Sequence, residues 1–129
     1  MGTHKVISII EEIFGGIELH ACVSLVDSEG LVLYSTGDCL DQMILEGLNA
    51  QLIVAFESAL RAFWDVPLSN ASLDYILINS GAIMFYVDDL VGELGLFLII
   101  RTRTDLMERV LPFLKSFVGI VEKNLIRSN

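Results

Sequence analysis

The sequence predicts a single α+β domain over residues 1–129, in an α/β/α arrangement whose helices cover both faces of a five-stranded antiparallel sheet. Three features indicate this class. The two ends of the chain and residues 40–64 repeat apolar side chains with a helical period. Five short runs rich in β-forming residues alternate with turn residues, in one group of two and one of three. Residues 94–100 are apolar on both faces, so this strand must be central and covered from both sides.

The composition indicates a protein that buries part of its surface against a partner. Hydrophobic residues make up 53% of the 129 residues, and the mean hydropathy is +0.64. No run approaches the roughly 20 apolar residues that a membrane-spanning helix needs. The N-terminal residues lack the features of a signal peptide, so we expect a cytoplasmic protein with no membrane insertion. The formal net charge of −9 argues against binding to nucleic acid.

The N-terminal part is predicted to form an amphipathic helix followed by a β-hairpin. The buried stripe of the helix consists of Val6, Ile9, Ile10, Ile13, Phe14 and Ile17, with Gly15 and Gly16 at its end. Residues 18–26 and 31–35 form the two strands, joined by a turn that contains a glycine. The two cysteines, Cys22 and Cys39, show neither metal-ligand spacing nor a disulfide framework, so Cys22 is expected to be a small core residue.

Residues 40–64 are predicted to form one long helix with two apolar stripes. One stripe consists of Ile44, Leu48, Leu52, Ala55, Ala59 and Phe63. The second consists of Leu45, Asn49, Ile53, Phe56, Leu60 and Trp64. Together they cover roughly half of the circumference, whereas a helix packed on one core needs about a third. We therefore predict that the second stripe is a dimer interface, covered by the same helix of another copy; the alternative is deeper burial within the chain's own fold.

Three further strands and a last helix complete the predicted domain. Residues 71–79, 82–87 and 93–102 form an antiparallel meander joined by tight turns. The candidates for pairing at the edge of the sheet are Leu73, Tyr75 and Leu77, with Ile76 and Ile78 as the alternative face. The last helix begins near a capping box of Asp105 and Glu108. Pro112 either kinks this helix or begins its regular part.

No constellation of residues indicates catalysis. His4 and His20 have no further ligand at metal-binding spacing. Asp88, Asp89 and Glu93 could hold a hard cation, but a solvated turn is the preferred interpretation. The sequence contains no nucleophile-elbow motif and no phosphate-binding loop. We therefore expect no enzymatic activity, no metal and no cofactor.

Residues 23–35 resemble the opening hairpin of the Roadblock/dynein light chain family. In that family an aliphatic strand ends in D-x-x-G, continues as a second aliphatic strand and stops at a small residue. Here these positions are Asp27, Gly30 and Ser35. The order of elements is similar over essentially the whole chain, with Pro112 and the bulky residues 63–64 as departures.

The resemblance implies a sheet with strand order 2-1-5-4-3, with the long helix on one face and the terminal helices on the other. It also implies a homodimer in which the third strands pair edge to edge and the long helices pack across the two-fold axis. The implied function is an interaction scaffold that docks a small Ras-like GTPase, as do the bacterial polarity-switch relatives of the Mgl type, with catalysis left to the GTPase. The alternatives are a PAS- or GAF-type sensor and a longin-like trafficking module.

Overall fold

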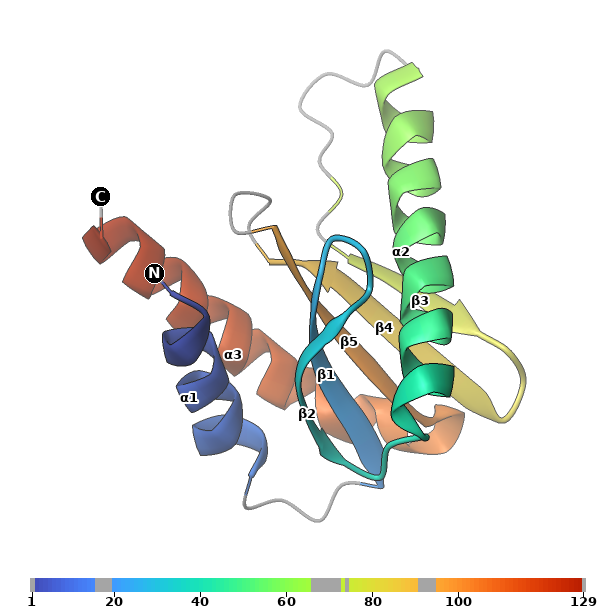
Figure 1. Cartoon of the computed structure of the whole chain (residues 1–129), viewed down its shortest axis with the longest axis horizontal. Coiled ribbons are helices and arrows are strands. Elements are labelled where there is room, and N and C mark those ends of the chain that lie inside the picture. The colour runs from blue at the N-terminus through green and yellow to red at the C-terminus, as the bar shows by residue number, and fades with distance from the viewer. Residues whose placement is uncertain (1, 16–19, 66–72, 74, 91–94, 129) are drawn as a thin grey trace.

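The fold is a three-layer α+β domain, as the sequence predicts. The computed structural model describes residues 2–15, 20–65, 73, 75–90 and 95–128, with the backbone alone for Trp64 and residues 125–128. Its elements are α1 (Thr3–Phe14), β1 (Ala21–Asp27), β2 (Val32–Gly37), α2 (Gln42–Asp65), β3 (Tyr75–Asn79), β4 (Ile83–Asp89), β5 (Leu96–Arg103), the 3-10 turn η1 (Thr104–Leu106) and α3 (Met107–Ser128). Helix α2 covers one face of the sheet, and α1 and α3 cover the other (Figure 1).

All neighbouring strands are antiparallel, in the order β2-β1-β5-β4-β3. This order confirms the one implied by the family resemblance. Strand β5 is central, and residues 96–100 are all buried, as expected for a strand that is apolar on both faces. The third strand is predicted over residues 71–79 and is observed over Tyr75–Asn79; residues 71, 72 and 74 lie outside the described residues.

The face covered by α1 and α3 carries the larger core. Val6, Ile9, Ile10 and Phe14 of α1 are buried there, as the predicted stripe requires, whereas Ile17 lies outside the described residues. From α3 the core takes Val110, Leu114, Phe117 and Val121. The rings of Phe14 and Phe117 lie 6.1 Å apart between centroids and join the two helices. Pro112 lies within α3, well after its first residue, so it does not begin the helix.

The opposite face is covered by α2, and here the structure corrects the sequence analysis. Leu45, Asn49, Ile53 and Phe56 have exposed fractions of 4% or less within the single chain. Phe56 packs edge-on against Phe97 of β5, with ring centroids 5.7 Å apart. These four residues are therefore core, and the prediction that a second copy covers them is wrong. Leu60 is half-buried against the same core, and the side chain of Trp64 lies outside the described part.

A disulfide bond joins Cys22 of β1 to Cys39, which precedes α2. The expectation that the two cysteines show no disulfide framework is therefore wrong, whereas Cys22 is buried, as expected for a core residue. The hairpin register explains the pairing, because Cys22 lies opposite Gly37 and the chain then turns back over β1. The two Cα atoms lie 4.8 Å apart, which is within the range that a disulfide bridges.

Helix α2 is long and largely apolar. Over Gln42–Phe63 it is the one described helix that is long and apolar enough to cross a membrane, judged by length and composition. Core helices of globular proteins share these properties, so length and composition do not establish a membrane span. The composition instead follows from a helix that is apolar both toward the sheet and away from it.

Candidate interaction surfaces

The outer face of α2, turned away from the sheet, is the first candidate surface. It consists of exposed residues spaced by three or four positions: Met43, Ile44, Gly47, Gln51, Val54, Ser58, Arg61 and Ala62. Met43, Ile44 and Val54 are 82%, 61% and 55% exposed. Large apolar side chains this exposed on one helix face indicate a surface that a partner covers. We refer to these eight residues as the α2 outer face.

Three of the eight residues of the α2 outer face are small: Gly47, Ser58 and Ala62. Gly47 lies inside the helix, and a Cβ atom built on it would meet nothing within 4 Å. The fold of the chain therefore gives no steric reason for glycine here, although glycine inside a helix costs about 0.5–1 kcal/mol relative to alanine. Ser58 and Ala62 lie farther along the helix, with Gln51 and Val54 between them and Gly47. The absence of a side chain at Gly47 permits another backbone to approach closely at that point.

The free edge of β3 is the second candidate surface. Strand β3 is the last strand of the sheet, and its backbone edge beyond β4 has no neighbour among the described strands. Tyr75 and Leu77 are 48% and 43% exposed, and the rings of Tyr75 and Tyr86 stack 5.2 Å apart. Ile76 and Ile78 point the other way and pack against the α2 core. Leu73 is half-buried beside the same core.

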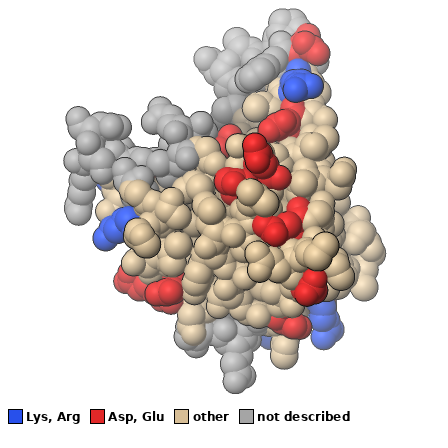
Figure 2. Space-filling model, viewed as in Figure 1, with Lys and Arg blue, Asp and Glu red and all other residues tan. Residues whose placement is uncertain are grey.

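Acidic side chains surround the α2 outer face. Figure 2 shows them scattered over α2 and the β1–β2 hairpin, with few basic side chains in this view. Asp41, Glu57 and Asp65 of this region are exposed, and Arg61 is an exposed cation on the helix. A partner that docks on this apolar strip therefore meets exposed carboxylates around it.

The hairpin residues predicted from the family motif have a structural role next to α2. The Asp27 Oδ1 atom accepts hydrogen bonds from the backbone N–H groups of Glu29 and Leu31, at 2.9 and 3.0 Å. Gly30 follows with φ of +93°, a conformation that glycine adopts without strain. Glu46 of α2 accepts a hydrogen bond from the Val32 N–H at 2.9 Å. Asp27 and Gly30 therefore fix the turn on which α2 rests. The third motif residue, Ser35, lies exposed on β2 and pairs with Ser24 of β1.

The residues considered for chemistry do not gather into a site. Among the described residues, no group of three or more His, Cys, Asp or Glu side chains could hold a metal ion. His4 and His20 are exposed at separate places in the chain. Asp88 is 6% exposed and accepts a hydrogen bond from the Tyr86 hydroxyl at 2.5 Å, so its assignment to a solvated turn is wrong. Glu93 lies outside the described residues.

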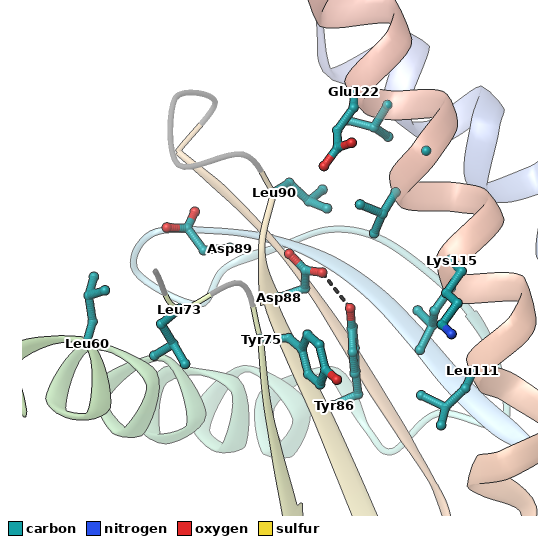
Figure 3. A pocket seen from close by; sticks show the side chains of 14 residues that line it. Leu60, Leu73, Tyr75, Tyr86, Asp88, Asp89, Leu90, Leu111, Lys115 and Glu122 are labelled. Carbon is teal, nitrogen blue, oxygen red and sulfur yellow. Dashed lines mark hydrogen bonds between the residues drawn. The ribbon is translucent and has the colours of Figure 1, made fainter. Parts of the chain in front are cut away.

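Both faces of the sheet are packed with apolar side chains from the helices. A PAS- or GAF-type sensor binds its ligand in a pocket on one face of its sheet, and on the face covered by α3 the structure leaves a cavity beside the end of β4 (Figure 3).

This architecture defines a Roadblock-type α+β fold with two candidate interaction surfaces. Neither a protein-family model nor a curated protein matches the sequence. Among solved structures, the chain is similar to MglB of Myxococcus xanthus, at 14% identity and a TM-score of 0.69, covering 100% of both chains. It is similar to the Roadblock/LC7 domain from Streptomyces avermitilis at 15% identity and a TM-score of 0.69, covering 90% of this chain and 97% of that one.

A third solved structure is MglB in a tetrameric arrangement, at 17% identity and a TM-score of 0.67, covering 95% of this chain and 90% of that one. These similarities confirm, at the level of the fold, the resemblance to the Roadblock family predicted from the hairpin and the order of elements. At such low identities the shared feature is the fold.

Proposed function

We propose that this chain is a homodimeric cytoplasmic scaffold that docks and regulates a small Ras-like GTPase and performs no catalysis itself. The α2 outer face is the observation that carries the proposal. A long helix with one face buried on its own sheet and an exposed apolar opposite face has the surface of an assembly component. The family resemblance supplies the class of partner.

The dimer that we propose uses different α2 residues from those predicted. The α2 outer face replaces the buried stripe, with Gly47, Gln51 and Val54 near its centre and Met43 and Arg61 toward its ends. A two-fold axis through this centre places the same patch on both subunits, as an isologous interface requires. Leu73, Tyr75 and Leu77 remain the proposed residues of the β3 edge, where strand pairing would satisfy the free backbone groups.

The dimer is tested by changing the charge of the α2 outer face. Ile44→Glu and Val54→Glu together place two carboxylates on each subunit's exposed stripe, without changing a residue buried in the chain. We expect light scattering to give a dimer for the wild type and a monomer for the double variant. Ser8→Glu, on the exposed side of α1, is the matched control and should remain dimeric. A wild type that is monomeric at all accessible concentrations would refute the dimer.

The partner class is tested separately. The tagged full chain is incubated with purified small Ras-like GTPases, each loaded with GDP or with a non-hydrolysable GTP analogue, and binding is measured by calorimetry. We expect one GTPase to bind with a preference for one nucleotide state. A dimer that binds none of them in either state would leave a scaffold without the GTPase role. Loss of binding in the charge-changed double variant would show that docking needs the dimer or the α2 outer face itself.

A further inference from the structure

The disulfide between Cys22 and Cys39 joins a buried residue to a more accessible one. Cys22 on β1 is 1% exposed, whereas Cys39 is half-buried and lies between β2 and α2, beside the exposed Asp38. In thiol–disulfide exchange the attacking thiolate must reach one sulfur atom, and the other sulfur atom leaves. A thiol from solvent therefore approaches the bond at Cys39, and Cys22 is the leaving sulfur.

Two hydrogen bonds that do not involve sulfur hold the segment around Cys39 next to β1. The Asp38 N–H donates to the Ala21 carbonyl at 3.0 Å, and the Arg101 guanidinium group donates to the Asp38 carbonyl at 3.1 Å. Figure 1 shows the chain between β2 and α2 beside the start of β1. These contacts do not depend on the S–S bond, so we expect the two thiols to stay close together after it opens. Thiols that are held close together re-form their bond readily, which a reversible pair requires.

A small void between the sheet and α2 brings Cys22 together with two buried polar side chains. Cys22, Ser24 and Asn49 line this void, and most of their neighbours there are apolar. Ser24 is 1% exposed and Asn49 is fully buried. The described side chains around the void leave no room for a water molecule. Hydrogen bonds for Ser24 and Asn49 must therefore come from protein groups, and Cys22 is one of these.

The closed disulfide leaves the Asn49 amide unsatisfied. Neither its Oδ1 nor its Nδ2 atom has a hydrogen-bond partner among the described residues. The Ser24 hydroxyl lies 3.5 Å from Cys22 Sγ and must be the donor in this contact, because a disulfide sulfur carries no hydrogen. A thiol at Cys22 brings one further hydrogen into the void. That hydrogen can go to Asn49 Oδ1, or to Ser24, whose own hydroxyl hydrogen then turns to Asn49.

We propose that Cys22 and Cys39 form a reversible thiol–disulfide site, which a dithiol reductant opens at Cys39, and that Asn49 stabilises the reduced form. A thiolate of the reductant attacks Cys39 Sγ, the S–S bond breaks, and Cys22 leaves as a thiolate that takes up a proton. The second thiolate of the reductant then attacks the mixed disulfide, which forms the reductant's own disulfide and releases the Cys39 thiol. Two electrons and two protons pass from the dithiol to the protein. The site does not depend on the proposed GTPase role.

The redox equilibrium tests the role of Asn49. The full chain is held at different ratios of reduced to oxidised dithiothreitol and then alkylated, and its free thiols are counted by intact mass. We expect Asn49→Leu to need at least about a fivefold higher ratio than the wild type for half reduction, because the closed form loses an unsatisfied amide and the reduced form loses a hydrogen bond. Asn49→Ala, which needs no additional space, should shift the midpoint in the same direction.

Leu52→Met is the matched control for this measurement. Leu52 lines the same void, and methionine has a similar volume and no hydrogen to donate, so the midpoint should stay within about twofold of that of the wild type. Circular dichroism establishes that each chain is folded in both redox states. A purely structural role of Asn49 would change stability equally in the two states and leave the midpoint unchanged. An unchanged or lower midpoint in the Asn49 variants would therefore overturn the proposal, as would a wild-type bond that does not open while the chain is folded.

The point of attack is tested with one cysteine at a time. Cys22→Ser leaves Cys39 as the single thiol, and Cys39→Ser leaves Cys22. The folded variants are mixed with Ellman's reagent, a small aromatic disulfide, and the released thiolate is followed by absorbance. We expect Cys39 to react at least about tenfold faster than Cys22, because Cys22 is buried. Equal rates, or a faster reaction at Cys22, would refute entry through Cys39.

Discussion

Gly30 in the β1–β2 turn and Ala50 in α2 touch backbone to backbone. A Cβ atom built on Gly30 would lie 2.8 Å from the backbone nitrogen of Ala50 and 2.9 Å from its Cα atom. The hairpin turn is therefore the surface on which the middle of α2 rests. The glycine of the D-x-x-G motif is needed both for its positive φ and for this contact.

Substitution of Gly30 should be among the most damaging single changes in the chain. Gly30→Ala strains a left-handed backbone and pushes the turn against α2, so we expect a loss of about 2–4 kcal/mol in the free energy of unfolding. Gly81→Ala is the matched control, because Gly81 also has a positive φ (+86°) but has open space around it. Strain alone should cost that variant about 1–2 kcal/mol. Urea denaturation of both proteins measures the difference, and equal losses would show that the contact with Ala50 contributes nothing.

Gly47 should affect association and stability in opposite directions. Gly47→Ala removes a helix-interior glycine whose Cβ space is open, so the single chain should gain about 0.5–1 kcal/mol. If the α2 outer faces pack closely in a dimer, the added methyl group separates the two backbones and weakens the dimer. Gly119→Ala in α3 is the control, with the same expected gain and no change in association. Sedimentation velocity and urea denaturation provide the two readouts; unchanged dimer affinity in Gly47→Ala would contradict close packing at this position.

Asn49 is a buried polar residue whose replacement should stabilise the fold. It is fully buried, and neither its Nδ2 nor its Oδ1 atom has a hydrogen-bond partner in the described structure. Asn49→Leu keeps the size of the side chain and removes the desolvation cost, so we expect a gain of about 1–3 kcal/mol. Thr102→Val is the contrasting variant: its hydroxyl donates to the His20 carbonyl at 3.1 Å, and its loss should cost about 1 kcal/mol. Destabilisation by Asn49→Leu would show that the amide has a partner in solution.

The features that the sequence predicts well depend on local patterns. The hairpin turn follows from Asp27 and Gly30, because the carboxylate and the positive φ act within five residues. The central place of β5 follows from a run that is apolar on both faces. The strand order follows from the family resemblance and from no local pattern, and the observed order agrees with it.

The orientation of α2 could not be read in the same way. Both of its apolar stripes satisfy the helical period, and which one faces the sheet depends on rotation about the helix axis. Contacts distant in sequence fix that rotation, above all Gly30 with Ala50 and Phe56 with Phe97. The one local feature that indicates which side of the helix is exposed is the set of small or polar residues Gly47, Gln51 and Ser58. No sequence pattern predicts the cavity between β4 and α3, because the residues that line it range from Leu60 to Glu122.

The disulfide between Cys22 and Cys39 should make stability depend on reductant. It closes a loop with a sequence separation of 17, for which the chain-entropy model gives about 3 kcal/mol. We therefore expect dithiothreitol to lower the urea midpoint of the wild type. Cys39→Ser should unfold at a lower midpoint that does not change with dithiothreitol, which separates the bond from a general effect of the reductant.

The state of these cysteines also bears on the proposed cytoplasmic location. Reducing conditions in most cytoplasms keep thiols free, whereas an oxidising compartment preserves the bond. Alkylation of the unfolded protein directly after lysis, followed by intact mass measurement, counts the free thiols. Two alkylated cysteines would show that the chain works in the cell with the bond open, with α2 then held over the sheet by its noncovalent contacts, among them those of Phe56, Ile53 and Gly30. If neither cysteine is alkylated, the result contradicts a reducing compartment for this chain. The proposed GTPase partner would then have to lie in the same oxidising compartment, because both proteins must share one location.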